Sequence, residues 1–102
     1  MAKHAIFLQH RTKPGARDEV QRIWRKHMQP AIEKNPGHEV YVYSFGSDPG
    51  RICAFQVYSS AEDANDFLKS QAYRDYEQEV TPLLEGAPQV EVLQPQWIKA
   101  AV

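Results

Sequence analysis

Two histidines are the side chains of this chain best placed to do chemistry. His10 lies near the end of an apolar segment at residues 4–12, and His27 lies on the apolar stripe of a helical pattern. Histidine changes its protonation state near neutral pH, so either one is a candidate catalytic base or hydrogen-bond donor in a pocket. The alternative for both is a structural role, in which a core histidine bonds to the backbone.

Aromatic residues recur at spacings that place them on shared faces. Tyr41 and Tyr43 alternate onto one face of a predicted strand, and Tyr73 and Tyr76 are neighbours on a predicted helix. Such residues usually build a core, but buried hydroxyls need hydrogen-bond partners, and a pocket for a flat aromatic ligand would use this lining. The expected ligand-binding residues are Trp24, Tyr41, Tyr43, Phe67 and Tyr73.

The other reactive residues do not combine into a familiar motif. His4 and His10 share a strand face but lie roughly 20 Å apart at about 3.3 Å per residue, which is too far to chelate one ion. His38, beside a turn, is expected to be solvated, so no metal site is predicted. Cys53 is expected to be a small buried apolar residue rather than a nucleophile. The sequence has no phosphate-binding glycine loop and no dinucleotide fingerprint.

Four turn signals divide the chain into the elements that must position these residues. They are Lys13-Pro14-Gly15, Asn35-Pro36-Gly37, Asp48-Pro49-Gly50 and Leu83-Leu84-Glu85-Gly86. Between them, the patterns predict strands at 4–12, 38–46 and 52–58, and a last strand within 88–97 that ends at Pro95 or soon after. They also predict a helix at 16–34 that Pro30 should kink or split, and helices capped by Ser59 or Ser60 and by Ser70. This order predicts an α+β fold of the ferredoxin-like βαββαβ type, a four-stranded antiparallel sheet with its helices on one face.

Length and composition narrow the class of protein. The 102 residues predict one domain, 1–102, with a modest core. The net charge of −1 gives no reason to expect binding to nucleic acid or to an anionic membrane, and no apolar run is long enough to span a bilayer. A single cysteine and an N-terminus without a signal-peptide core predict a cytoplasmic location.

The sheet face without helices is expected to need a partner. The strands at 4–12 and 52–58 are apolar on both faces, so the bare face would expose a large apolar patch. Packing against a second copy is the simplest cover, and it predicts a homodimer through the open sheet face. The tail at 97–102 is too apolar for a free end and is expected to lie on the partner subunit.

The turn signals, in this order, resemble the antibiotic biosynthesis monooxygenase family of small dimeric α+β barrels, which includes the quinol monooxygenases. The resemblance rests on Lys13-Pro14-Gly15 and on the segments 35–41, 48–58, 60–73 and 83–86. Gln56 stands where many members have glutamate, and Phe67 stands where many have histidine. Residues 66–70 resemble a segment of the haem-degrading members, but Glu77 stands where those have the haem-ligating histidine, so no haem is expected.

The resemblance implies a cofactor-free monooxygenase that acts on a small aromatic or quinol substrate. The pocket would exclude water, a base would deprotonate the substrate, and donors would stabilise the developing oxyanion. His27 or His10 would be the base, Tyr41, Tyr43 and Tyr73 the donors, and Trp24 and Phe67 the stacking partners. Two alternatives stay open: a non-catalytic dimer that binds a small hydrophobic molecule, and an isomerase or cyclase on the same barrel.

Overall fold

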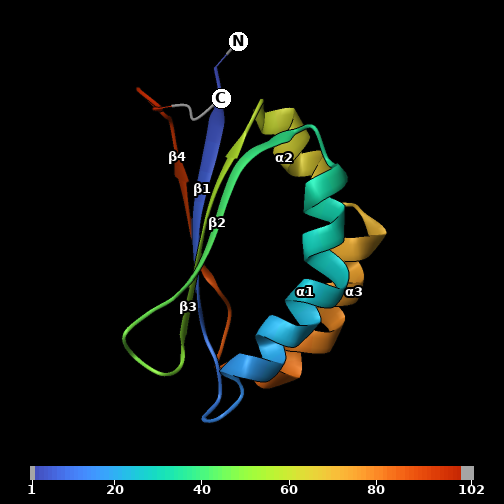
Figure 1. Ribbon diagram of the computed structural model, residues 1–102, viewed down its shortest axis with the longest axis vertical. Coiled ribbons are helices and arrows are strands. Elements are labelled where there is room, and N and C mark those ends of the chain that lie inside the picture. Colours follow the sequence, from blue (N-terminus) through green and yellow to red (C-terminus); the bar gives the residue numbers. More distant parts are fainter. Residues whose placement is uncertain (1, 100–102) are drawn as a thin grey trace.

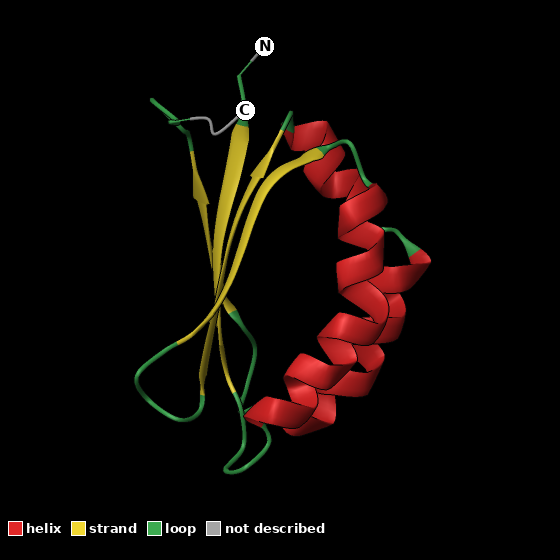
Figure 2. Ribbon diagram, in the orientation of Figure 1, coloured by secondary structure: helices red, strands yellow, loops and turns green. Residues whose placement is uncertain are grey.

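The computed structural model describes residues 2–99, which form an antiparallel sheet with helices on one face only (Figures 1 and 2). The strands follow the order β2-β3-β1-β4 in the sheet, which is the arrangement expected for a ferredoxin-like fold. The fold prediction is therefore confirmed. The elements are β1 (His4–Arg11), α1 (Arg17–Lys34), β2 (His38–Phe45), β3 (Arg51–Tyr58), α2 (Ala61–Leu68), α3 (Gln71–Val80), a short 3₁₀ turn (Thr81–Leu83) and β4 (Gln89–Leu93).

The turn and cap residues act as the sequence predicts. Gly15 has φ of 77°, a left-handed conformation that suits glycine, and it lies in the turn between β1 and α1. The hydroxyl of Ser60 accepts a hydrogen bond from the backbone N–H of Asp63, and that of Ser70 accepts one from Tyr73. These two caps begin α2 and α3 as separate helices, so the second helical region is interrupted at Lys69 and Ser70.

Two boundaries differ from the prediction. Pro30 does not split α1, which continues as a helix to Lys34. A proline removes only one backbone hydrogen bond, and the last turn is held by Ala31 and Ile32, which pack against the core. The last strand ends at Leu93, slightly earlier than the predicted end at or just after Pro95, and residues 100–102 of the predicted partner-binding tail lie outside the described residues.

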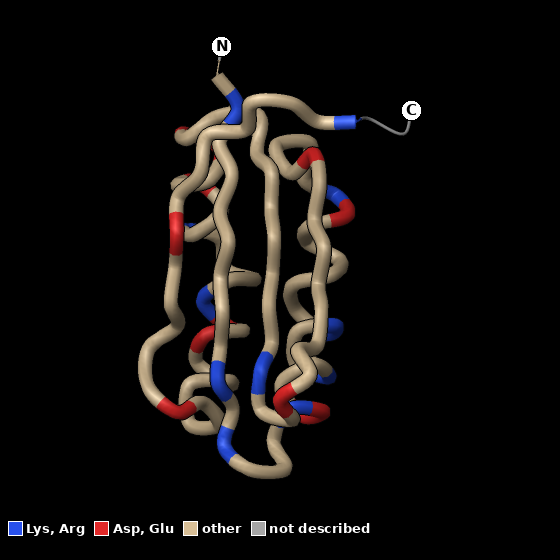
Figure 3. The backbone as a smooth tube through the Cα atoms, turned by 90° about the vertical axis from the view of Figure 1, so that its left-hand side faces the viewer, with Lys and Arg blue, Asp and Glu red and all other residues tan. Residues whose placement is uncertain are grey.

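The strand register assigns each side chain to one face of the sheet. Ile6 pairs with Gln56, and Gln56 pairs with Tyr41, so these residues share the face beneath the helices. Phe7 pairs with Phe55, and Phe55 pairs with Val42, which places these three on the opposite, open face. Figure 3 views the molecule from this open side. Apart from Arg51 at its start, the central strand β3 carries no Lys, Arg, Asp or Glu.

The core lies between the helices and the sheet. Val20, Ile23, Trp24 and Met28 face the sheet from α1, and Tyr76 and Val80 face it from α3. On α2, Phe67 is buried, whereas Leu68 at the end of the helix is 45% exposed. No helix among residues 2–99 combines the length and the hydropathy needed to cross a bilayer.

Candidate functional site

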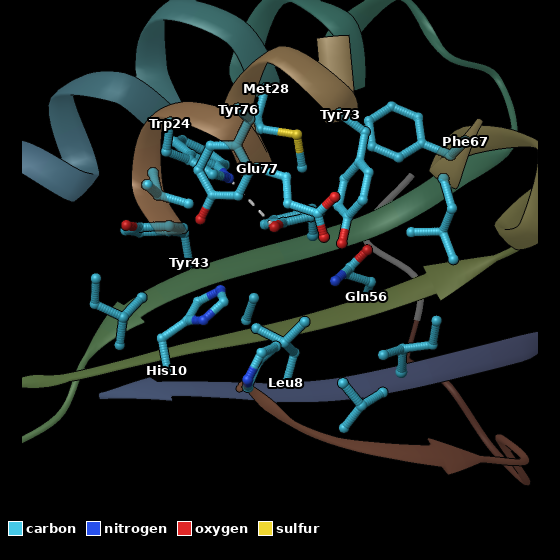
Figure 4. A pocket seen from close by; sticks show the side chains of 18 of the residues that line it. Leu8, His10, Trp24, Met28, Tyr43, Gln56, Phe67, Tyr73, Tyr76 and Glu77 are labelled. Carbon is cyan, nitrogen blue, oxygen red and sulfur yellow. Dashed lines mark hydrogen bonds between the residues drawn. The ribbon is translucent and has the colours of Figure 1, made fainter. Parts of the chain in front are cut away.

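An apolar cavity of about 180 Å³ lies between the inner face of the sheet and the helices (Figure 4). An apolar cavity of about 150 Å³ is large enough to take up benzene, so this one has room for a ligand of one or two rings. It is a single space bounded by every major element of the fold. The strands form its floor, and α1, α2 and α3 form its roof.

The floor combines aliphatic side chains with polar ones at alternate strand positions. Leu8 and His10 project from β1, Tyr41 and Tyr43 from β2, and Gln56 from β3. The two-residue repeat of a strand places all of them on the same face. The predicted pair Tyr41 and Tyr43 therefore lies on the cavity wall, together with His10.

The roof supplies the stacking surfaces. Trp24 projects from α1 and lies 4.3 Å from Tyr43 and 5.6 Å from Tyr41 between ring centroids. Its indole N–H donates a hydrogen bond to the Tyr41 hydroxyl at 3.3 Å. Phe67 from α2 and Tyr73 from α3 meet with their rings at a steep angle. All five predicted ligand-binding residues thus line one cavity, and their role in binding stays a prediction.

The tyrosine hydroxyls of the cavity are hydrogen-bond donors rather than phenolates. Burial raises the pKa of Tyr41 to about 12, with a smaller opposing effect from the Trp24 hydrogen bond. Burial also raises the pKa values of Tyr43, Tyr58, Tyr73 and Tyr76. The cavity therefore offers neutral O–H groups around an apolar centre, an arrangement suited to an oxygen atom on an aromatic ring.

His10 is a neutral imidazole in this wall. Burial lowers its pKa from 6.5 to about 4, so it carries no charge at neutral pH. Its Nδ1 atom and the hydroxyl of Tyr43 are both buried, and neither has a hydrogen-bond partner among residues 2–99. Leaving a buried polar atom unpaired costs about 1–3 kcal/mol, so a ligand or water that pairs with them would recover part of that energy.

His27 does not line the cavity, contrary to expectation. Its Nε2 atom is hydrogen-bonded to the carboxylate of Glu79, which places it at the contact between α1 and α3. Met28, the next residue, occupies the wall position that the apolar stripe had suggested for His27. The stripe is centred on Val20, Trp24 and Met28, so His27 lies at its edge. Its catalytic role stays an untested prediction.

A second polar group beneath the helices joins Gln56 and His38 to Tyr58, which the sequence analysis did not single out. The hydroxyl of Tyr58 donates a hydrogen bond to the side-chain oxygen of Gln56 at 2.7 Å, and both residues are buried. His38 lies 4.3 Å from the ring of Tyr58 and 4.5 Å from that of Phe67. His38 is therefore partly buried, contrary to the expectation that it is solvated, and this burial lowers its pKa.

Glu77, which the sequence analysis considered only as the counterpart of a haem-ligating histidine, also lines the wall, although it is exposed on α3. It projects from α3 into the cavity beside Tyr73, as Figure 4 shows. The signal was present, because Glu77 follows Tyr73 by four residues, which places both on one helix face. Within residues 2–99, no three His, Cys, Asp or Glu side chains lie close enough together to hold a metal ion.

The sequence matches the family model of the antibiotic biosynthesis monooxygenases over residues 4–79. This range runs from the start of β1 to the last residues of α3, and it includes every predicted site residue. The sequence matches no curated protein.

Solved structures with the same fold cover nearly the whole chain. Rv0793 of Mycobacterium tuberculosis is 23% identical, with 99% of this chain and 100% of that chain aligned and a TM-score of 0.83. A Nitrosomonas europaea protein provisionally named an antibiotic biosynthesis monooxygenase is 12% identical. The alignment covers 97% of this chain and 95% of that chain, with a TM-score of 0.89. A protein from Chloroflexus aurantiacus J-10-fl with the same provisional name is 22% identical. The alignment covers 97% of this chain and 98% of that chain, with a TM-score of 0.83. At these identities the likeness shows the fold.

Proposed function

Because this chain belongs to the antibiotic biosynthesis monooxygenase family, we propose that it oxidises a small aromatic or quinol-type substrate with molecular oxygen in the cavity between helices and sheet, without a cofactor. The observation that carries the proposal is the composition of the cavity wall. It joins aromatic stacking surfaces to several protonated tyrosine hydroxyls and one uncharged imidazole.

The reaction makes few demands on the protein because the substrate supplies all the electrons. A quinol loses one ring hydrogen and both hydroxyl hydrogens, and the ring carbon gains a hydroxyl group whose oxygen comes from O₂, so two of the three hydrogens go to water and one to the new hydroxyl. The second oxygen atom leaves as water, so the product is a hydroxyquinone and the substrate has been oxidised by four electrons. The protein must bind the ring, take up the hydroxyl proton and stabilise the electron-rich anion.

Each wall group has a part in this scheme. Trp24 and Phe67 stack against the ring, and the hydroxyls of Tyr41, Tyr43 and Tyr73 donate hydrogen bonds to the developing oxyanion. The unpaired Nδ1 atom of His10 accepts the substrate proton, directly or through a water molecule. The apolar remainder of the wall keeps bulk water away, which strengthens these hydrogen bonds.

The test is oxygen uptake with 1,4-naphthalenediol, prepared without air and added to the protein in air-saturated buffer. We expect uptake of one O₂ per substrate, faster than autoxidation in buffer, and one labelled oxygen atom in 2-hydroxy-1,4-naphthoquinone when ¹⁸O₂ is used. Uptake at the buffer rate, or hydrogen peroxide in place of labelled product, would contradict the proposal. His10→Gln is the matched variant, and we expect it to slow turnover by 10²- to 10⁴-fold.

A second candidate is a non-catalytic dimer that binds a small hydrophobic molecule. The low pKa of His10 favours it, because a general base works best when its pKa lies near the operating pH. A saturable thermal shift with the diol and no labelled product would select this candidate. Anaerobic turnover of a substrate would instead select the isomerase or cyclase.

We also propose that a second copy of the chain covers the open face of the sheet. Phe7, Phe55 and Val42 form an apolar row across three strands of this face, and Val42 is 49% exposed. A two-fold dimer that packs the two sheets face to face would bury this row in both subunits.

A further inference from the structure

The side-chain amide of Gln56 lies on the cavity floor with its two ends in different surroundings. Gln56 is only 7% exposed, and it belongs both to the cavity wall and to the buried polar group with Tyr58. An amide has an oxygen that accepts hydrogen bonds and a nitrogen that donates them. The orientation of this amide therefore determines which kind of ligand atom the cavity floor can bind.

The tautomer of the neighbouring His38 follows from the turn that precedes it. The backbone N–H of Gly37 donates to the side-chain oxygen of Asn35 at 3.1 Å, so this oxygen faces the backbone. The side-chain nitrogen of Asn35 therefore meets Nδ1 of His38, at 2.9 Å, and because an amide nitrogen only donates, Nδ1 is the acceptor. Burial lowers the pKa of His38, so the ring is neutral at pH 7 and carries its proton on Nε2.

Two hydrogen-bond donors consequently lie on one side of the Gln56 amide. The hydroxyl of Tyr58 donates to the Gln56 side-chain oxygen at 2.7 Å. The Nε2–H group of His38 is buried and has no hydrogen-bond partner among residues 2–99. Gln56 opposes the effect of burial on the pKa of His38, as an oxygen close to that N–H should do. Turning the amide over would set its nitrogen, a donor, against the His38 N–H, so the oxygen stays on this side.

The amide nitrogen is left on the cavity side. No hydrogen bond joins it to another group within residues 2–99. Figure 4 shows the amide of Gln56 rising from β3, with its nitrogen pointing into the space between Tyr73 and Leu8.

We infer that Gln56 binds an oxygen atom of the aromatic ligand: its N–H₂ group donates to a ring ketone or ring oxyanion, and Tyr58 and His38 hold the amide in that orientation. This rests on the proposed function and specifies the substrate atom that the floor of the cavity recognises. A site built to hydrogen-bond one group of its ligand discriminates strongly against an analogue that lacks the group, because the buried partner is then left unpaired.

The test uses isothermal titration calorimetry with three probes of similar size. Indan-1-one carries a carbonyl acceptor, indole carries an N–H donor, and indane carries neither. Gln56→Met keeps the length of the side chain and removes the amide. We expect it to lower the affinity for indan-1-one relative to indane by about tenfold, and to change the affinity for indole relative to indane by less than about threefold. Gln78→Met makes the same change at an exposed position on α3 and should alter neither ratio.

Nuclear magnetic resonance of the ¹⁵N-labelled wild-type protein provides a second measurement, which needs no variant. The ring nitrogens of His38 should show a protonated Nε2 and an unprotonated Nδ1 at pH 7.5. A proton on Nδ1, an unchanged indan-1-one ratio in Gln56→Met, or a selective loss of indole affinity in that variant would each overturn the inference.

The outcome is independent of oxygen chemistry, because binding is measured without turnover. The expected loss of indan-1-one affinity in Gln56→Met, without ¹⁸O incorporation by wild type, would remove the monooxygenase proposal and leave this inference standing. Incorporation of ¹⁸O with an unchanged ratio would do the opposite.

Discussion

His27 on α1 and Glu79 on α3 form a hydrogen-bonded pair across the contact between the two helices. A carboxylate only accepts, so Nε2 of His27 is the donor. This hydrogen bond is the main cause that lowers the pKa of Glu79. The pair couples α1 and α3, two of the three helices that form the roof of the cavity, while its side chains lie beside the cavity rather than within it.

Replacing His27 should therefore affect stability more than chemistry. His27→Ala removes the hydrogen bond and some packing, and we expect it to lower the free energy of unfolding by about 1–2 kcal/mol. His27→Gln retains a donor and much of the volume, so its melting temperature should stay close to wild type. Both variants should keep oxygen-dependent turnover. Loss of turnover in His27→Gln with an unchanged melting temperature would instead identify His27 as the base.

Two tyrosines of the cavity should respond oppositely to the same substitution. Tyr43→Phe removes a hydroxyl with no partner among residues 2–99, so we expect it to be neutral or to stabilise the ligand-free protein by up to about 1 kcal/mol. Tyr58→Phe leaves the buried Gln56 without its donor and should destabilise by about 1–3 kcal/mol. Urea unfolding measures both. Equal effects of the two substitutions would show that the hydroxyl of Tyr43 is paired in solution.

Stability should fall as the pH drops below 6.5, because the folded protein holds His10 neutral. The unfolded chain binds a proton on His10 at its ordinary pKa of 6.5, whereas the folded chain does so only near 4. The contribution is therefore complete above pH 6.5 and is lost between 6.5 and 4. At 1.36 kcal/mol per pKa unit, wild type should lose about 2 kcal/mol at pH 5 relative to pH 7.5.

The matched variant for this experiment is His10→Gln, which has no titrating group at the position. Urea unfolding at pH 7.5 and pH 5 should show a smaller loss in the variant, by about 2 kcal/mol. His38, whose pKa is also lowered by burial, contributes a loss of the same sign to both proteins and cancels in the comparison. Identical pH dependence in the two proteins would mean that His10 is solvated.

A charge at Phe55 should prevent the proposed dimer. Phe55→Asp introduces a carboxylate at the centre of the apolar row on the open face, where a partner sheet could not solvate it. Light scattering should report the dimer mass for wild type and the monomer mass for the variant at micromolar concentration. Gln78→Asp adds the same charge to an exposed position on α3 and should leave the dimer intact. A monomer mass for wild type would remove the proposal.

The architecture could be predicted from the sequence because local turn signals mark the boundaries between its helices and strands. Pro14-Gly15, Pro36-Gly37 and Pro49-Gly50 act through backbone dihedrals that do not depend on the rest of the fold. The cavity residues on strands were predictable for a related reason. A strand repeats every two residues, so the face that Tyr41 and Tyr43 share is known as soon as the strand is recognised.

The helical side of the site was harder to predict. A helical stripe is broad, so residues at its edge, such as His27, fall inside or outside the cavity according to how the helices pack. The side chain of Glu77 is exposed, as expected on a solvated helix face, and only the packing of the helices shows that it also borders the cavity. His38 similarly looks like a turn residue in the sequence, and only the packing of Phe67 from α2 against it covers part of its ring.

The short β4 strand leaves one side of the cavity wall in contact with solvent. Val90 on this edge strand and Leu68 at the end of α2 both line the cavity, and they are 56% and 45% exposed. A small molecule can reach the interior past these residues while α1 and α3 stay packed. Association should therefore follow ordinary diffusional encounter without waiting for a lid to open. Good and poor ligands would then differ chiefly in residence time, which the interior contacts determine.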